Sequence, residues 1–113
     1  MPSSSDSKTD LLQGLMDLLV LKSVADEPLH GYGLAQRLRL LSGDRLRIPQ
    51  GSLYPALHRL EHKGFLKGVW SASPTGREAK YYQLTAKGRR RLDAELREWH
   101  ELSTAIALVL RPA

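Results

Sequence analysis

One short segment in the middle of the chain carries the side chains whose chemistry is easiest to interpret. Gln50, His58 and Arg59 are of the types that hydrogen-bond to the edges of DNA bases. Gly51 and Ser52 stand where a helix is expected to begin, and the free backbone N–H groups and the hydroxyl at such a place suit a phosphate. The segment therefore predicts contact with nucleic acid.

Other chemistries find less support in the same sequence. His58 and His62 have a spacing that can hold a metal, but no Glu follows His58 and no third ligand is evident. Residues 31–33 (Gly-Tyr-Gly) follow no predicted strand and lack the third glycine of a dinucleotide-binding loop. The chain has no cysteine, and no serine lies in a nucleophile elbow. We expect no catalytic site, no metal and no cofactor.

The charge balance favours a polyanionic partner. The chain has 17 Lys and Arg against 12 Asp and Glu, a formal net charge of +5. Basic residues concentrate in one stretch that is opposed only by Glu78. They are Arg77, Lys80, Lys87, Arg89, Arg90 and Arg91. The run at 87–91 is either a phosphate-facing surface or a solvated helix face.

The central segment is expected to lie on the third of three helices. Residues 31–41 and 50–63 repeat apolar side chains at helical spacing, with Gly43 and Gly64 as stop signals. The predicted buried stripes are Leu34, Ala35, Leu38 and Leu41, and then Leu53, Ala56, Leu57 and Leu60. Pro55 is easiest to accommodate in a first helical turn, so the third helix should begin close before it.

The N-terminal part predicts a tail and a first helix. Residues 1–9 are polar and Ser-rich, so we expect a disordered tail. Asp10 and Gln13 form a capping box for a helix that ends at residues 26–28. That helix is apolar nearly all round, which indicates that a partner chain covers part of it.

The last third of the chain predicts a hairpin and a long helix. Residues 65–71 and 79–84 read as strands around a turn at 73–76, with Trp70 packing on the hairpin. Thr85 is the expected N-cap of a helix that reaches about Leu110. The fold class is thus mostly α with a small β-hairpin. We expect a winged helix-turn-helix at residues 10–84 and a dimerisation helix at 85–113.

Three ordered motifs resemble the PadR-type winged-helix regulators. They are Leu29-His30-Gly31-Tyr32-Gly33-Leu34, the run from Gly51 to Glu61, and Tyr81-Tyr82-Gln83-Leu84-Thr85-Ala86-Lys87-Gly88. The resemblance covers most of the chain after the tail. It implies a transcriptional repressor that binds double-stranded DNA as a homodimer, with its last helix packed against the partner's first and last helices.

The resemblance also implies roles for individual residues. Ser52, Tyr54 and Pro55 would lie at DNA, and Arg77 and Lys80 would belong to the wing. Together with the residues chosen for their chemistry, the expected DNA-binding set is Gln50, Gly51, Ser52, Tyr54, Pro55, His58, Arg59, Arg77 and Lys80.

Spacing in the last helix independently predicts a dimer. Apolar residues recur there at alternating steps of four and three residues, as in a coiled coil. The expected dimerisation residues are Leu15, Leu19, Leu92, Leu96, Trp99, Ile106 and Leu110. The alternative is that the stripe packs only on the protein's own core. A twofold dimer would set its recognition helices ~34 Å apart and predicts an inverted-repeat operator.

Two further interpretations of the sequence remain open. Trp99 lies in the expected dimer seam, where some relatives hold flat aromatic effectors, although packing alone also explains it. The winged fold could instead bind a protein rather than DNA. No signal peptide or membrane span is evident, so we expect a soluble, cytoplasmic protein.

Overall fold

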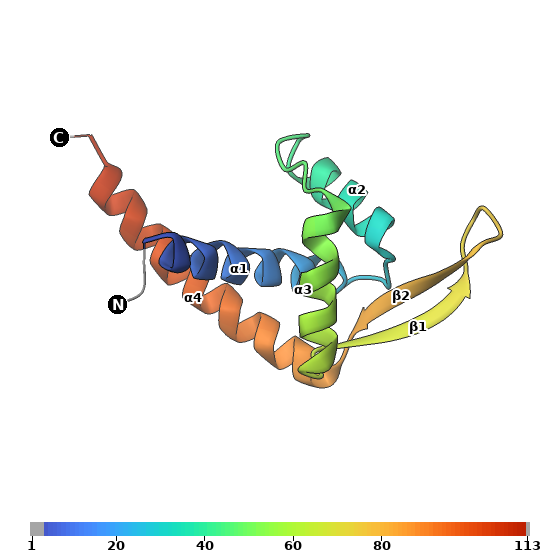
Figure 1. Ribbon diagram of the computed structural model, residues 1–113. Coiled ribbons are helices and arrows are strands. Elements are labelled where there is room, and N and C mark those ends of the chain that lie inside the picture. Colours follow the sequence, from blue (N-terminus) through green and yellow to red (C-terminus); the bar gives the residue numbers. More distant parts are fainter. Residues whose placement is uncertain (1–3, 113) are drawn as a thin grey trace.

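The computed structural model contains four helices and one antiparallel hairpin (Figure 1). It describes the backbone of residues 4–112 and the side chains of residues 13–112. In chain order the elements are α1 (Ser4–Ser23), α2 (Gly31–Leu41), α3 (Gln50–His62), β1 (Leu66–Ala72), β2 (Glu78–Leu84) and α4 (Ala86–Leu110). This order is that of a winged helix followed by a long helix, as predicted.

Helix α1 starts earlier than the capping box predicts. It begins at Ser4 rather than near Asp10, so the tail predicted to be disordered overlaps the helix from Ser4 onward. No Gly or Pro interrupts residues 4–13. Once the apolar part has nucleated the helix, each added residue gains a hydrogen bond, and the polar residues extend it. The first three residues of the predicted tail lie outside the described residues.

The core lies where α1, α2, α3 and the base of the hairpin meet. It is formed by Val20, Leu21, Val24, Leu34, Leu38, Leu53, Ala56, Leu57, Leu60, Leu66, Tyr82 and Leu92. The stripe predicted for α3 is confirmed in full. In α2 the stripe fails at Leu41, which is 66% exposed because the helix ends there and the chain turns away.

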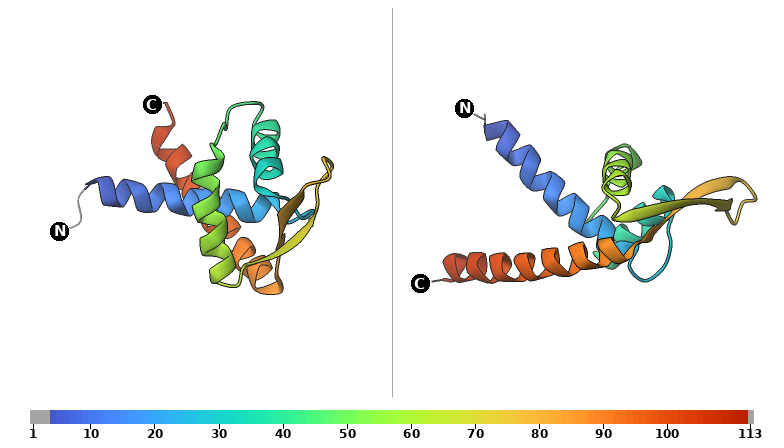
Figure 2. Two further views of the ribbon diagram at one scale, coloured as in Figure 1. Left: turned by 45° about the vertical axis from the view of Figure 1, so that its right-hand side comes forward. Right: turned by 90° about the horizontal axis from the view of Figure 1, so that it is seen from below.

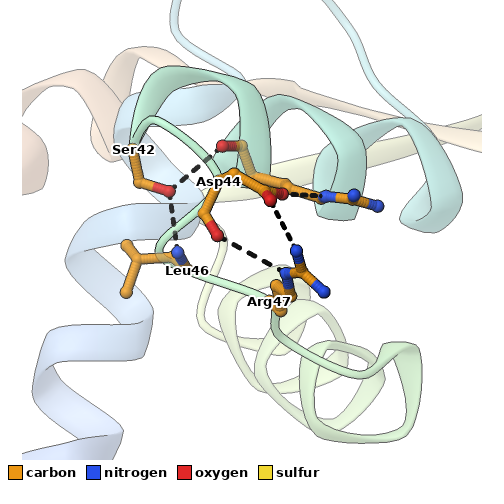
Figure 3. Close-up of polar contacts among 5 residues, drawn as sticks. Ser42, Asp44, Leu46 and Arg47 are labelled. Atoms are coloured by element: carbon orange, nitrogen blue, oxygen red, sulfur yellow. Dashed lines mark hydrogen bonds and ion pairs between the residues drawn. The ribbon is translucent and has the colours of Figure 1, made fainter.

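The connection between α2 and α3 is fixed by polar contacts around Asp44 (Figure 3). Gly43 and Asp44 both have positive φ, 62° and 68°, which reverses the chain after α2. The Asp44 carboxylate accepts hydrogen bonds from Arg39 and Arg47. These two hydrogen bonds hold the pKa of Asp44 below its usual range, and the bond from Arg39 has the larger effect. Both arginines are thereby engaged within the connection.

Pro49 is the N-cap of helix α3, and Pro55 lies inside the helix. The N–H groups of Ser52 and Leu53 donate to the Pro49 carbonyl, at 2.9 and 3.3 Å. Helix α3 begins at Gln50, as the predicted range 50–63 has it, but Pro55 lies beyond the first turn in which it was expected. Pro55 is on the exposed side of the helix and has no backbone N–H to donate within it.

The hairpin is a regular wing whose base belongs to the core. Its strands pair from Leu66 with Leu84 to Ala72 with Glu78, and Gly76 turns the tip with φ of 85°. Leu29, just before α2, exchanges both backbone hydrogen bonds with Tyr82. This bridge was not predicted, and it ties the start of α2 to β2.

Helix α4 begins at the predicted N-cap. The Thr85 hydroxyl accepts a hydrogen bond from the Gly88 N–H at 2.9 Å. In the right-hand view of Figure 2, α1 and α4 spread apart from the body of the fold toward the two termini. Leu92 is 1% exposed in the protomer's own core, which corrects its assignment to the dimer seam, since it is not free to contact a second chain.

Candidate nucleic-acid interface

A hollow of ≈ 650 Å³ lies between the start of α2, the outer side of α3 and the wing. Tyr54 and His58 border it from α3, and Arg77 and Lys80 border it from the wing. Four residues predicted from the sequence to contact DNA are therefore gathered around one concave surface. Its walls come from three elements that the core holds together.

The start of α3 presents the other predicted residues beside this hollow. Gly51, Ser52 and Pro55 are exposed, and Gln50 is half-buried. None of them lines the hollow itself. The Tyr54 hydroxyl lies 3.5 Å from the Gln50 side-chain oxygen, a long contact that links the helix start to the hollow.

Tyr54 is positioned by a close approach to α2. A Cβ added at Gly31 would lie 3.1 Å from the Tyr54 ring and its hydroxyl, so glycine leaves just enough room for the ring. The ring therefore rests on the first residue of α2 with one side open to solvent. Gly31 and Tyr54, which belong to two different sequence motifs, are thus in close contact.

Arg59, predicted to read a base, points away from the hollow in the structure without DNA. Its guanidinium forms an ion pair with Asp17 of α1. Only 13% of the Asp17 side chain is exposed, so the carboxylate draws the long arginine side chain toward α1 and away from the hollow. No local sequence signal predicts this pair, because the two residues lie far apart along the chain.

Lys80 is also engaged within the protein. Its Nζ donates to Glu61 Oε1 at 2.7 Å, and the Gly68 N–H donates to the other Glu61 oxygen at 3.2 Å. Glu61 therefore ties the last turn of α3 to both strands of the wing. Lys80 borders the hollow, but its ammonium is directed at Glu61 rather than free for phosphate.

The Glu61–Lys80 pair has a pH-dependent consequence. The hydrogen bond from Lys80 is the main cause that lowers the pKa of Glu61, and the bond to Glu61 raises the pKa of Lys80. Because the pKa of Glu61 is lower in the folded chain than its ordinary 4.5, the stabilisation is present above about pH 4.5. It is lost as the pH falls through the folded pKa.

We therefore expect Glu61→Gln to lower the free energy of unfolding by about 1 kcal/mol at pH 7 and to have little effect at pH 3. Denaturant unfolding at both pH values measures the difference. Glu78→Gln is the matched control, since Glu78 lies exposed on the wing with no ion pair among residues 13–112. An equal loss for Glu61→Gln at pH 3 and pH 7 would contradict the role of the ion pair.

The remaining basic residues divide into two groups. Lys87 donates to the Lys63 carbonyl at 2.8 Å and Arg89 to the Ala25 carbonyl at 3.3 Å, while Arg91 pairs with Glu95 at 2.8 Å. The basic run at the start of α4 thus helps to join elements. Arg77, by contrast, is exposed on the wing and has no acidic partner within the described part of the chain.

Three aromatic residues border the hollow without having been predicted to contact DNA. They are His30, Tyr32 and Trp70, and Trp70 is 64% exposed rather than packed on the hairpin. The place of His30 directly before a predicted helix indicated a turn or capping contact, and His30 is indeed the N-cap of α2. The exposure of Trp70 was not predicted, because residue alternation along a short strand does not show which face is exposed and which is packed.

Trp99 lies in a second hollow, of ≈ 270 Å³, between the diverging ends of α1 and α4. Leu15 and Leu18 border it from α1, and Trp99 and Leu102 from α4. Trp99 is 44% exposed, so one face of its indole is uncovered by the protomer.

No three His, Asp or Glu side chains among the described residues come together as a metal site. No helix among residues 4–112 is both long and apolar enough to cross a bilayer.

Comparison with known proteins agrees with this architecture. The Transcriptional regulator PadR-like family matches residues 20–94. A transcriptional regulator of Mycobacterium tuberculosis is 36% identical over 89 residues, which is 79% of each chain. A PadR-like transcriptional regulator from Bacillus cereus has a TM-score of 0.78 at 28% identity, covering 92% of this chain and 99% of that one.

A PadR family transcriptional regulator from Eggerthella lenta is similar too, with a TM-score of 0.74 at 30% identity over 96% of this chain and 93% of that one. The family consists of transcriptional regulators rather than enzymes, and its members bind DNA. The match spans α2, α3 and the wing, the three elements around the hollow. The chain therefore belongs to the PadR-like family of transcriptional regulators.

Proposed function

We propose that the protein is a sequence-specific repressor that binds an inverted-repeat operator as a homodimer, in the cytoplasm. The observation that carries this proposal is the hollow between α3 and the wing. It brings the exposed Tyr54 and His58 beside the unpaired cation of Arg77. An exposed helix face can enter the major groove while a wing contacts the flanking backbone.

Support for the dimer comes from the far half of α4. Several large apolar side chains there are between 44% and 82% exposed, where α1 and α4 have diverged. They are Trp99, Leu102, Ile106, Leu108, Val109 and Leu110. A second copy related by a twofold axis would bury the same stripe on both chains. Of the residues assigned to the seam, Leu96, Trp99, Ile106 and Leu110 remain exposed, and Leu15 and Leu19 are half-buried.

Selection of bound sequences from a random DNA pool tests this proposal. We expect two half-sites in inverted orientation, with centres about one helical turn of DNA apart. Affinity for the selected operator should fall with salt, with a slope of log K against log salt of roughly −5 to −9 if six to ten phosphates are contacted. Failure to retain the protein on any DNA at low salt would instead favour a protein-binding module.

A second role, as a ligand sensor, is favoured by the hollow at Trp99. Its lining combines three leucines and the indole of Trp99 with the charged side chains of Arg91, Glu95 and Glu98, a mixture that suits a flat aromatic molecule with polar substituents. We propose that such an effector would bind between α1 and α4 and release the operator. Repeating the operator titration with flat aromatic compounds tests this role, because affinity unchanged by every compound would remove it.

A further inference from the structure

His30 lies at the N-cap of α2, and its imidazole is oriented by one hydrogen bond. Its Nδ1 accepts a hydrogen bond from the Gly33 N–H at 2.9 Å. An acceptor nitrogen must keep its lone pair, so the single proton of the neutral ring is on Nε2. The cap therefore fixes His30 as a hydrogen-bond donor on the side of the ring that faces away from Gly33.

The ring of His30 is held by two tyrosines. It stacks with Tyr32 at a centroid distance of 6.4 Å and meets the edge of Tyr81 at 5.1 Å. Among residues 13–112 no hydrogen bond uses Nε2. His30 is half-buried and borders the same hollow as Tyr54, His58 and Arg77. An oriented donor without a protein acceptor thus lies at the rim of the candidate interface.

We propose that the Nε2–H of His30 donates a hydrogen bond to a backbone phosphate oxygen of the bound DNA. This inference rests on the proposed function. A phosphate suits the site better than a base edge, because the helix before a recognition helix crosses the DNA backbone. The first turn of α2 carries no acidic residue, and Glu78, the one carboxylate bordering the hollow, comes from the wing beside Arg77.

The contact has an unusual combination of properties. It adds hydrogen-bond energy, but a neutral imidazole brings no charge and displaces no counterion from the DNA. It reads no sequence, because phosphates are the same at every base pair. Loss of the donor is therefore expected to weaken operator and random DNA by the same factor and to leave the salt dependence unchanged.

The decisive variant carries a methyl group on Nε2 of His30, introduced by chemical synthesis of the chain. It keeps the ring and the Nδ1 cap, and it replaces the donated proton by a methyl group. Because the methyl group also adds bulk at the contact, the smaller His30→Ser variant must show the loss as well. We expect its affinity for the operator and for random DNA to fall at least about tenfold at one salt concentration. The slope against salt should match that of the unmodified chain.

His30→Ser gives a genetically accessible second measurement, since serine is an equally good N-cap. It should show the same loss of affinity with a similar unfolding midpoint. Arg77→Ala is the control. It should lower affinity and also make the salt slope shallower by about 1 for each phosphate that the arginine neutralises.

Undiminished DNA binding by the methylated chain would overturn the proposal. A loss confined to the operator would overturn the phosphate assignment in favour of a base contact. If the unmodified chain binds no DNA, the proposed function fails, and this inference falls with it.

Discussion

Replacing Gly88 by alanine is expected to destabilise the protein by about 2–4 kcal/mol, although alanine is the better helix former. A Cβ at this position would lie 2.0 Å from the Phe65 carbonyl oxygen and 2.8 Å from Leu84 Cδ1. The first of these atoms belongs to the backbone, so it cannot move aside without shifting the hairpin base away from α4. Denaturant unfolding at a fixed protein concentration measures the loss.

Gly14→Ala is the matched control for Gly88→Ala. Gly14 also lies within a helix, but apart from the adjacent helix backbone no described atom comes within 4 Å of an added Cβ there. We expect this variant to gain up to ~1 kcal/mol from helix propensity alone. If both alanine variants had the same stability, the close approach of α4 to the hairpin base would not be a real constraint.

The second large effect is expected at the ion pair between α1 and α3. Arg59→Met should lower the free energy of unfolding by about 1–3 kcal/mol, because it leaves the mostly buried Asp17 carboxylate without its partner. The double variant Asp17→Leu with Arg59→Met should recover most of that loss, since it removes both charges. Arg59 Nε has no hydrogen-bond partner among the described residues, so an apolar side chain also removes an unsatisfied donor.

The same pair of variants separates a scaffold role of Arg59 from base recognition. We expect the double variant to select the same operator as the natural chain, because Arg59 faces α1 in the structure. A changed operator preference at restored stability would contradict this expectation. It would mean that Arg59 leaves Asp17 on DNA and reads a base after all.

Local signals predicted most of the fold. The bounds of α2 followed from a helical apolar period that ends in Ser42-Gly43. The Thr85 cap of α4 followed from a hydroxyl residue placed directly before a long amphipathic segment. Both signals depend on residues within a few positions of each other, which is why the sequence alone was sufficient.

Errors arose where distant segments meet. The direction of Arg59 depends on Asp17, and that of Lys80 depends on Glu61, so neither side chain could be assigned from its own neighbourhood. Leu92 shares the spacing of the exposed stripe but lies where α4 still touches the core. Periodicity marks the apolar side of a helix, but it does not say which part of that side another segment of the same chain already covers.

The uncovered apolar half of α4 bears on how the amount of protein would control a gene. If two copies must pair before an operator is held, occupancy at low expression rises with the square of the concentration rather than in proportion to it. A twofold change in synthesis would then change occupancy about fourfold. The stripe from Trp99 to Leu110 would thus give the regulator a dosage threshold, set by the hydrophobicity of one helix end.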